Sequence, residues 1–184
     1  MKKFTQILCL GLILAATACV PSLHPLFTED SLIFEESLVG TWEEDDNIWQ
    51  FRKSSSRSYK LIMTDAEGRK GEFETHLVKI GEHRYLDLYP VEPDLEENDF
   101  YKMHLLPTHT FMWVKQIEPN LQLSPMGPGA IKELVSQYPE AVKHEIVQDT
   151  VVLTAHTQEL QAFVKKFHDF KGLFGEPGDL ERVK

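Results

Sequence analysis

Short runs in which apolar and polar residues alternate dominate the chain between residues 38 and 123. Alternation of this kind is typical of strands in which every second side chain is buried. It predicts strands over residues 38–43, 48–52, 59–64, 72–80, 83–89, 100–106, 109–117 and 121–123, and a further strand over 147–153. Apolar residues recur at helical spacing near residues 130–138 and 157–168, which predicts two short helices there. The chain is therefore expected to be mainly β with two short α-helices.

The dipeptide Gly81-Glu82 separates two of the predicted strands and suits a two-residue type II′ hairpin turn. Such a turn sets a register in which Ile80 pairs with His83, Leu77 with Leu86 and His76 with Asp87. Both faces of the resulting meander are then partly apolar, whereas a sheet with one face in water shows a cleaner alternation. This pattern suits a sheet that curls on itself or is covered by helices. We expect an antiparallel β-barrel, or a strongly curled sheet, with a helix towards the C-terminus.

A positively charged start and a short apolar run open the chain. Lys2 and Lys3 precede residues 7–16, an apolar stretch of about ten residues that fits the core of a secretory signal peptide. A membrane-spanning helix needs roughly twenty apolar residues, so this stretch is too short to cross a bilayer. These features predict a signal peptide over residues 1–18, with cleavage between Ala18 and Cys19.

The residues around the cleavage point, Ala16-Thr17-Ala18-Cys19, resemble the lipobox of bacterial lipoproteins. In those proteins small residues admit the lipoprotein signal peptidase, and the cysteine becomes lipidated. The resemblance implies that Cys19 carries a lipid that anchors the chain to a membrane. The alternative is ordinary secretion with a free thiol at Cys19. Because Cys9 leaves with the signal peptide, Cys19 has no intramolecular disulfide partner.

The residue after the cysteine bears on where such a lipoprotein resides. Val20 stands where lipoproteins retained at the inner membrane commonly have aspartate. By resemblance to lipoproteins of bacteria with two membranes, this favours the outer membrane. We therefore expect a lipid-anchored protein of the bacterial cell envelope, in the outer membrane.

Composition divides the remainder of the chain into three parts. Residues 19–36 contain two prolines and four acids and are predicted to be a lipidated tether. Residues 37–172 hold the predicted strands and helices, and this length suits one domain with its own core. Residues 173–184 are punctuated by glycine and proline and are predicted to be a flexible tail.

The charge of the chain limits its partners. The formal net charge is −10, and it becomes about −12 once Lys2 and Lys3 leave with the signal peptide. Nucleic-acid binding requires clustered lysine and arginine, so this balance argues against it. It also disfavours electrostatic adhesion to anionic lipids, which leaves the acyl chains on Cys19 as the expected membrane contact.

The first predicted strand begins with Gly40-Thr41-Trp42. This start, followed by a meander of short strands and a late helix, resembles the Gly-X-Trp opening of lipocalin-like (calycin) β-barrels. The resemblance implies that the tryptophan plugs the closed end of a barrel that holds a small apolar ligand. The predicted helix at 130–138 interrupts the strands, and the sequence offers no clear match for the arginine that packs on this tryptophan. The start Leu-Val-Gly-Thr-Trp is also similar to that of a group of uncharacterised envelope lipoproteins, which implies no activity.

Aromatic residues and one histidine–carboxylate pair are the candidate ligand-binding residues. An apolar ligand in the barrel would meet Trp42, Trp49, Tyr59, Tyr85, Trp113, His76 and Asp87. The alternative for the aromatic residues is that they form the core, since aromatics dominate any small core. The alternative for His76 and Asp87 is a cross-strand pair on the solvent side.

The sequence lacks the common catalytic motifs, among them His-Glu-X-X-His, Cys-X-X-Cys, Gly-X-Ser-X-Gly and a phosphate-binding glycine loop. No catalytic residue, metal ligand or cofactor is therefore predicted. The expected function is non-enzymatic: an envelope lipoprotein that binds a small apolar ligand. One alternative is an assembly lipoprotein with a packed interior that binds an envelope protein. Another is an enzyme with an unrecognised histidine–carboxylate site.

Overall fold

The computed structural model describes residues 19–92, 96 and 98–183. The predicted signal peptide, including Ala18, lies outside the described residues. The strands are β1 Leu32–Ile33, β2 Gly40–Glu44, β3 Asn47–Lys53, β4 Tyr59–Thr64, β5 Lys70–Ile80, β6 His83–Pro90, β7 Thr110–Gln116, β8 Leu121–Pro125, β9 His144–Val147, β10 Thr150–Leu153 and β11 Gly178–Arg182. The helices are α1 Asp99–Lys102, α2 Pro128–Gln137 and α3 Thr157–Phe167, with short 3-10 turns η1 Glu29–Ser31 and η2 Glu36–Leu38.

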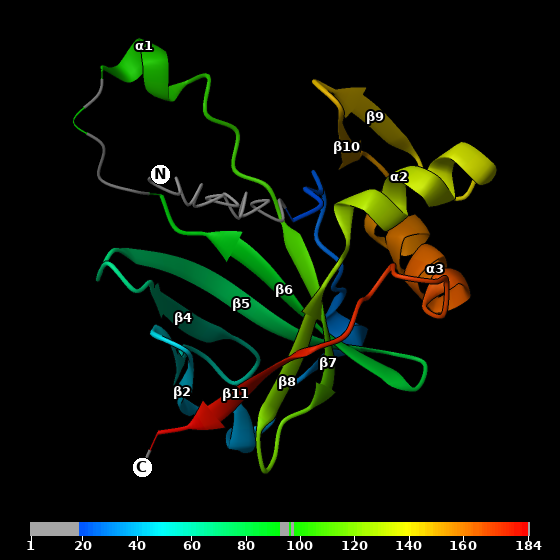
Figure 1. Cartoon of the computed structure of the whole chain (residues 1–184). Helices are drawn as coiled ribbons and strands as arrows, with labels where there is room; N and C mark the ends of the chain where they lie inside the picture. The colour runs from blue at the N-terminus through cyan, green and yellow to red at the C-terminus, as the bar shows by residue number, and fades with distance from the viewer. Residues whose placement is uncertain (1–18, 93–95, 97, 184) are drawn as a thin grey trace, which may run out of the picture.

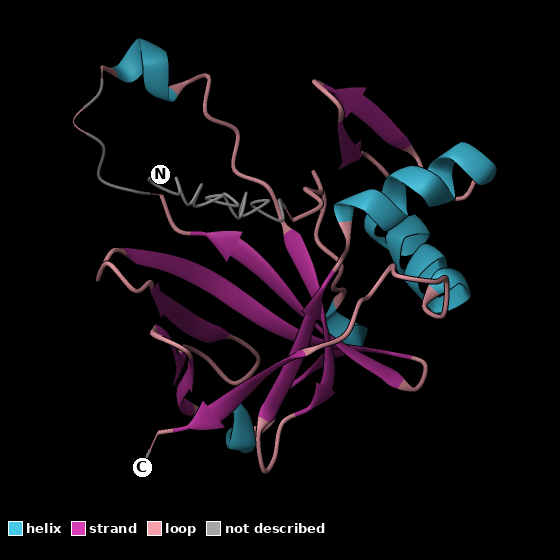
Figure 2. Cartoon of the chain, in the orientation of Figure 1, coloured by secondary structure: helices cyan, strands magenta, loops and turns pink. Residues whose placement is uncertain are grey.

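Eight antiparallel strands close into a barrel (Figures 1 and 2). Their order around the barrel is β5-β4-β3-β2-β11-β8-β7-β6, and β6 pairs again with β5. The first half of β5 pairs with β4, whereas its second half also pairs with the two-residue strand β1. The expected antiparallel barrel with a C-terminal helix is thus confirmed. The single strand expected over residues 147–153 is instead a separate hairpin, β9–β10, which turns at Gln148 and Asp149, and the short helix α1 was not expected.

The hairpin of β5 and β6 has the register that its turn predicted. Ile80 lies opposite His83, Leu77 opposite Leu86, and His76 opposite Asp87. Gly81 has a φ of +60°, the left-handed conformation that a type II′ turn requires at this position. Both explanations offered for its two apolar faces are correct: the sheet closes on itself, and helices cover part of its outer face.

Each face of the sheet contributes to a different core. The inner core fills the barrel and includes Trp42, Phe51, Tyr59, Leu61, Leu77, Leu86, Val114, Leu121 and Leu180. The outer core lies between the other face of β5, β6 and β7 and the helices, and it includes Val78, Tyr85 and Phe111. The helices α2 and α3, in yellow and orange in Figure 1, lie side by side over this face. Because successive side chains along β5 and β6 point to opposite faces of the sheet, their alternation decides which of the two cores a side chain joins.

Both predicted helices are present, with the expected buried stripes. Pro128 occupies the first turn of α2, where its missing N–H costs no hydrogen bond. The N-cap of α3 is His156, whose backbone N–H donates to the carboxylate of Glu159 at 3.0 Å. Their buried residues are Ile131, Leu134 and Val135 in α2, and Leu160, Phe163 and Val164 in α3.

The segment predicted as a tether, residues 19–36, packs on the barrel instead. Val20 and Leu26 are buried in the outer core. The backbone of Ser22 exchanges two 2.9 Å hydrogen bonds with His109, just before β7. The prolines and acids suggested a tether. The prediction failed because local composition does not reveal a backbone partner about ninety residues away, and such pairings depend on tertiary context.

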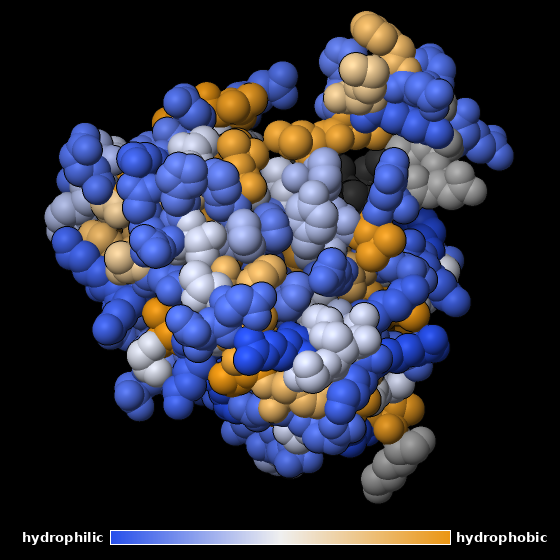
Figure 3. Space-filling view, turned by 180° about the vertical axis from the view of Figure 1, so that it is seen from behind, coloured by the Kyte–Doolittle hydropathy of each residue, from blue (hydrophilic) through white to orange (hydrophobic). Residues whose placement is uncertain are grey.

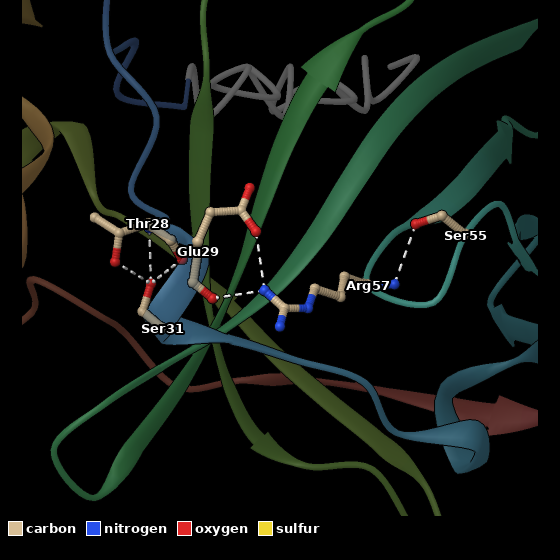
Figure 4. A network of polar contacts seen from close by, with 5 residues as sticks. All are labelled: Thr28, Glu29, Ser31, Ser55 and Arg57. Carbon is tan, nitrogen blue, oxygen red and sulfur yellow. Dashed lines mark hydrogen bonds and ion pairs between the residues drawn. The ribbon is translucent and has the colours of Figure 1, made fainter.

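Side-chain contacts hold the next turn, η1, near the β3–β4 connection (Figure 4). The side chain of Ser31 accepts a hydrogen bond from the N–H of Thr28 at 2.8 Å. The guanidinium of Arg57 lies 2.9 Å from the carboxylate of Glu29. Both side chains of that pair are largely exposed, so the ion pair contributes less than the buried residues that precede it.

Two further predictions along the chain are wrong. The expected flexible tail, residues 173–184, begins with the fully buried Leu173 and continues into β11, which closes the barrel between β2 and β8. The strand expected over residues 100–106 is instead the short helix α1 and an extended loop. Asn98 caps α1 by accepting a hydrogen bond from the N–H of Tyr101 at 2.8 Å. We call residues 98–108 the arm.

Candidate functional site

The first candidate residue, Trp42, lies in the inner core of the barrel, close to η2. Its side chain is fully buried, and its indole N–H donates to the carbonyl of Leu38 at 3.0 Å. The guanidinium of Arg182 stacks on the indole ring 4.1 Å from its centroid and donates to the carbonyls of Val39 and Ser37. An arginine therefore packs on this tryptophan, which the sequence did not reveal because Arg182 lies in the segment predicted to be a flexible tail.

Tyr59 lies in the same inner core, where its ring stacks on Phe34. Its hydroxyl accepts from the N–H of Glu35 at 2.7 Å, and burial raises the pKa of this phenol to about 12. Tyr59 thus holds the segment before η2 rather than a ligand. Trp49 lies directly opposite Trp42 on β3, is half-buried and packs against the inner core.

Large side chains occupy the interior of the barrel. Its fully buried members include Trp42, Phe51, Tyr59, Leu61, Leu77, Leu86 and Leu121. At the end formed by the β2–β3 and β4–β5 turns, Trp49, Met63 and Phe73 line an open hollow of about 280 Å³. This volume lies at the lower limit of the range for small-molecule pockets.

Two of the predicted ligand-binding residues, Tyr85 and Trp113, lie outside the barrel. They belong to the outer core, beneath α2 and α3. The hydroxyl of Tyr85 lies 2.8 Å from Nδ1 of His168, and burial raises its pKa. The predicted aromatic set therefore divides between two cores. The hairpin register contained this information, since it placed Tyr85 and Leu86 on opposite faces.

The histidine ring next to Tyr85 is packed among aromatic side chains at the C-terminal end of α3. His168 stacks on His83 with ring centroids 3.5 Å apart, and Trp113 and Phe174 also contact it. Burial, and then the neighbouring His83, lower the pKa of His168, while Asp169 acts in the opposite direction. A histidine with a depressed pKa contributes stability above its unfolded pKa and loses it as the pH falls through the folded value.

We therefore expect the free energy of unfolding to decrease as the pH falls below 6.5, the ordinary pKa of histidine. Replacing His168 with glutamine removes this titration and should make the decrease smaller. Urea unfolding at about pH 7 and about pH 5 measures the difference. His104→Gln is the matched control, because His104 is exposed on the arm. An equal decrease in the His168→Gln variant and in the unsubstituted chain would contradict the expectation.

The predicted pair His76 and Asp87 lies across neighbouring strands, but Asp87 bonds elsewhere. Its buried carboxylate lies 2.7 Å from Nδ1 of His109 and accepts from the N–H of Leu26 at 2.6 Å. His76 stacks instead on Phe27, at 4.0 Å between ring centroids, and burial lowers its pKa. Asp87 therefore fastens the N-terminal segment to the start of β7, a role that the sequence did not indicate.

A larger apolar hollow lies outside the barrel, between the arm and the end of β6. It has a volume of about 720 Å³, within the range of small-molecule pockets. Tyr89, Pro90, Val91 and Glu92 form one wall, and Lys102, His104, Leu105, Leu106 and Pro107 form the other. Figure 3 shows the arm overhanging the body, with hydrophobic residues at its root. We call this space the arm hollow.

None of the predicted ligand-binding residues lines the arm hollow. The sequence offered one signal, the apolar run Leu105-Leu106-Pro107, which was assigned to a strand. Among the described residues the run pairs with no strand, and its leucines are accessible, with Leu105 46% and Leu106 72% exposed. Two adjacent leucines with this exposure are available to contact a ligand.

Among the described residues, no set of three or more histidine, cysteine, aspartate or glutamate side chains is placed to hold a metal ion. In the same part of the chain, no helix has both the length and the apolar character needed to span a membrane. No protein-family model matches the chain, and neither curated proteins nor solved structures give a significant match.

Proposed function

We propose that this chain is a non-enzymatic envelope lipoprotein, anchored by a lipid on Cys19, that binds a small apolar ligand in the arm hollow. The observation that carries the proposal is the hollow itself, which has a volume of about 720 Å³ and leucine and proline side chains on its walls. Its polar groups, Lys102, His104 and Glu92, are few, as is usual where they orient rather than enclose a ligand.

The position of Cys19 supports this proposal. Cys19 is exposed, and it precedes Ser22, whose backbone pairs with His109 directly after the arm. Three residues of extended chain span at most about 10 Å. The proposed lipid attachment is therefore close to the base of the arm, and the arm hollow is close to the membrane that would supply an apolar ligand.

The arm hollow is a better candidate than the barrel interior for two reasons. The interior already contains fully buried residues such as Trp42 and Leu77, which a ligand would have to displace. Leu105 and Leu106, in contrast, are accessible on the arm. An enzymatic role has less support, because the buried carboxylate of Asp87 is engaged by Leu26 and His109.

A second candidate function is the binding of an envelope protein, as expected for a barrel with a packed interior. The exposed apolar residues of the arm favour it, because such residues mark interaction surfaces when they are contiguous. The two candidates differ in what remains bound after purification. A ligand carrier yields an apolar molecule in an organic extract of the purified chain, whereas a protein-binding lipoprotein does not.

A charge placed in the arm hollow tests the proposed ligand site. We expect Leu106→Asp to weaken the binding of a fluorescent fatty acid roughly tenfold or more, because it removes apolar contact and introduces a charge. Ile146→Asp is the matched control, since Ile146 is an exposed apolar residue on β9 that does not line the hollow. Fluorescence titration of both variants and of the unsubstituted chain measures the dissociation constants.

Phe73→Asp, in the smaller hollow at the end of the barrel, separates the two possible locations of the ligand. If Phe73→Asp weakens binding and Leu106→Asp does not, the ligand occupies the barrel and the proposal for the arm hollow is wrong. Equal affinities of all three variants and the unsubstituted chain would contradict both locations.

A further inference from the structure

The end of the arm exposes three large side chains that do not line the arm hollow. Phe100, Tyr101 and Met103 lie on or next to α1 and are 73%, 53% and 79% exposed. We call these residues the arm tip. Figure 1 shows the arm projecting from the barrel, well away from α2 and α3. The arm tip is thus presented outwards by an element that contributes little to either core.

The base of the arm and the proposed lipid attachment are adjacent. His109 ends the connection that carries the arm, and it is bonded through both backbone groups to Ser22, three residues after Cys19. Asp87 reinforces this junction through its bonds to His109 and Leu26. A lipid on Cys19 would therefore hold the root of the arm at the bilayer surface, so a bilayer is the apolar partner nearest to the arm tip.

The composition of the arm tip suits the interfacial region of a bilayer. Tyrosine has an apolar ring and a polar hydroxyl, and such side chains are enriched at the level of the lipid headgroups. Phenylalanine and methionine supply the apolar area that drives shallow insertion. The nearby charges are Glu92, Glu96, Asp99 and Lys102, a net acidic set on a chain of formal charge −10. An uncharged lipid surface therefore fits better than an anionic one.

We propose that the arm tip inserts into the headgroup region of the bilayer that holds the lipid on Cys19. This inference rests on the proposed lipoprotein function and extends it: insertion fixes the orientation of the barrel and turns the arm hollow towards the membrane surface. A ligand could then pass between the lipid and the wall formed by Leu105 and Leu106 without crossing water.

The experiment measures the depth of two labelled positions in the full, lipid-anchored chain reconstituted in phosphatidylethanolamine–phosphatidylcholine vesicles. Met103→Cys places a polarity-sensitive fluorophore on the arm tip, and Ile146→Cys places the same fluorophore on β9, where the parent side chain is 58% exposed. Nitroxide-labelled lipids should quench the probe at position 103 at least about threefold more than the probe at position 146. Anionic lipid should reduce the difference. Equal quenching at the two positions would overturn the proposal.

Failure of the lipid anchor is distinguishable from failure of the insertion. Mass spectrometry of the mature N-terminus reports whether Cys19 carries a lipid. Flotation of the Cys19→Ser chain with the same vesicles then tests the arm tip alone. We expect weak flotation that falls at least about tenfold when Phe100 and Met103 are both replaced by serine, and that persists when Ile146 and Val147, also exposed, are replaced instead. Flotation that is unaffected by the arm-tip substitutions, or a concentration-dependent dimer that they abolish, would overturn insertion.

Discussion

Replacing Asp87 with alanine is expected to destabilise the fold by about 3–5 kcal/mol. The carboxylate is fully buried and satisfies two groups, the N–H of Leu26 and the ring of His109. Without it, the N–H of Leu26 and the half-buried ring of His109 lose this partner, and each unsatisfied buried group costs about 1–3 kcal/mol. Urea unfolding, compared at a constant m-value, measures the change.

Two variants make the Asp87 result interpretable. Asp87→Asn keeps an acceptor for Leu26 but loses the charge beside His109, so we expect an intermediate destabilisation. Glu74→Ala removes a largely exposed carboxylate on β5, the strand next to Asp87, where it lies near His76. It should change the free energy of unfolding by less than about 1 kcal/mol. A loss in Asp87→Ala no greater than in Glu74→Ala would show that the carboxylate does not fasten the N-terminal segment.

The Asp87 junction also links stability to the proposed function. The residues that it joins, Leu26 and His109, belong to the segment after Cys19 and to the base of the arm. Loss of the junction would let the lipid attachment and the arm move independently, so an arm tip held at the membrane by Cys19 would lose its fixed placement. The depth difference between probes at positions 103 and 146 should therefore shrink in Asp87→Asn, which retains enough stability to fold.

Local sequence predicted those parts of the fold that local chemistry determines. The positive φ of Gly81 fixes a two-residue turn, and from that turn the pairing of His76 with Asp87 follows by counting. The helices α2 and α3 followed from apolar residues at helical spacing. In each case the information lies within a few residues of the element that it specifies.

The remaining elements depend on partners distant in sequence. Strand β11 has a single buried residue, Leu180, and glycine and proline before it, so its pattern resembles that of a loop. It is a strand because β2 and β8 leave a gap in the barrel that only an additional chain can fill. Arg182 and the 3-10 turn η2 then meet over Trp42, an arrangement that no local pattern indicates.

The candidate site was predicted only in part for the same reason. Tyr85 and Trp113 were selected by residue type, although parity along β6 places Tyr85 against the helices. Leu105 and Leu106 were assigned to a strand, because an apolar run without a tertiary partner cannot be distinguished locally from a paired one. A hollow between two segments depends on where those segments are placed, which composition alone does not specify.

Trp42→Ala is expected to destabilise the barrel by about 3–5 kcal/mol. Trp42 is fully buried among the inner-core residues, it bonds to the carbonyl of Leu38, and it supports the guanidinium of Arg182. Its removal leaves a large cavity in an interior where close packing limits relaxation. Urea unfolding with intrinsic fluorescence from Trp49 and Trp113 can measure this change, since both remain in the variant.

Two further substitutions separate the packing of Trp42 from its capping. Trp49→Ala, at the half-buried position directly opposite Trp42, should cost about 1–2 kcal/mol, because less area leaves the core. Arg182→Lys keeps the charge but not the fork that reaches two carbonyls, and it should cost about 1 kcal/mol or less at this exposed position. If Trp42→Ala lowered the free energy of unfolding as little as Arg182→Lys does, backbone pairing alone would hold this part of the barrel, and the tryptophan would not be needed for stability. If the side chain of Trp42 holds β2 and η2 together, Trp42→Ala should destabilise the fold most, Trp49→Ala less and Arg182→Lys least.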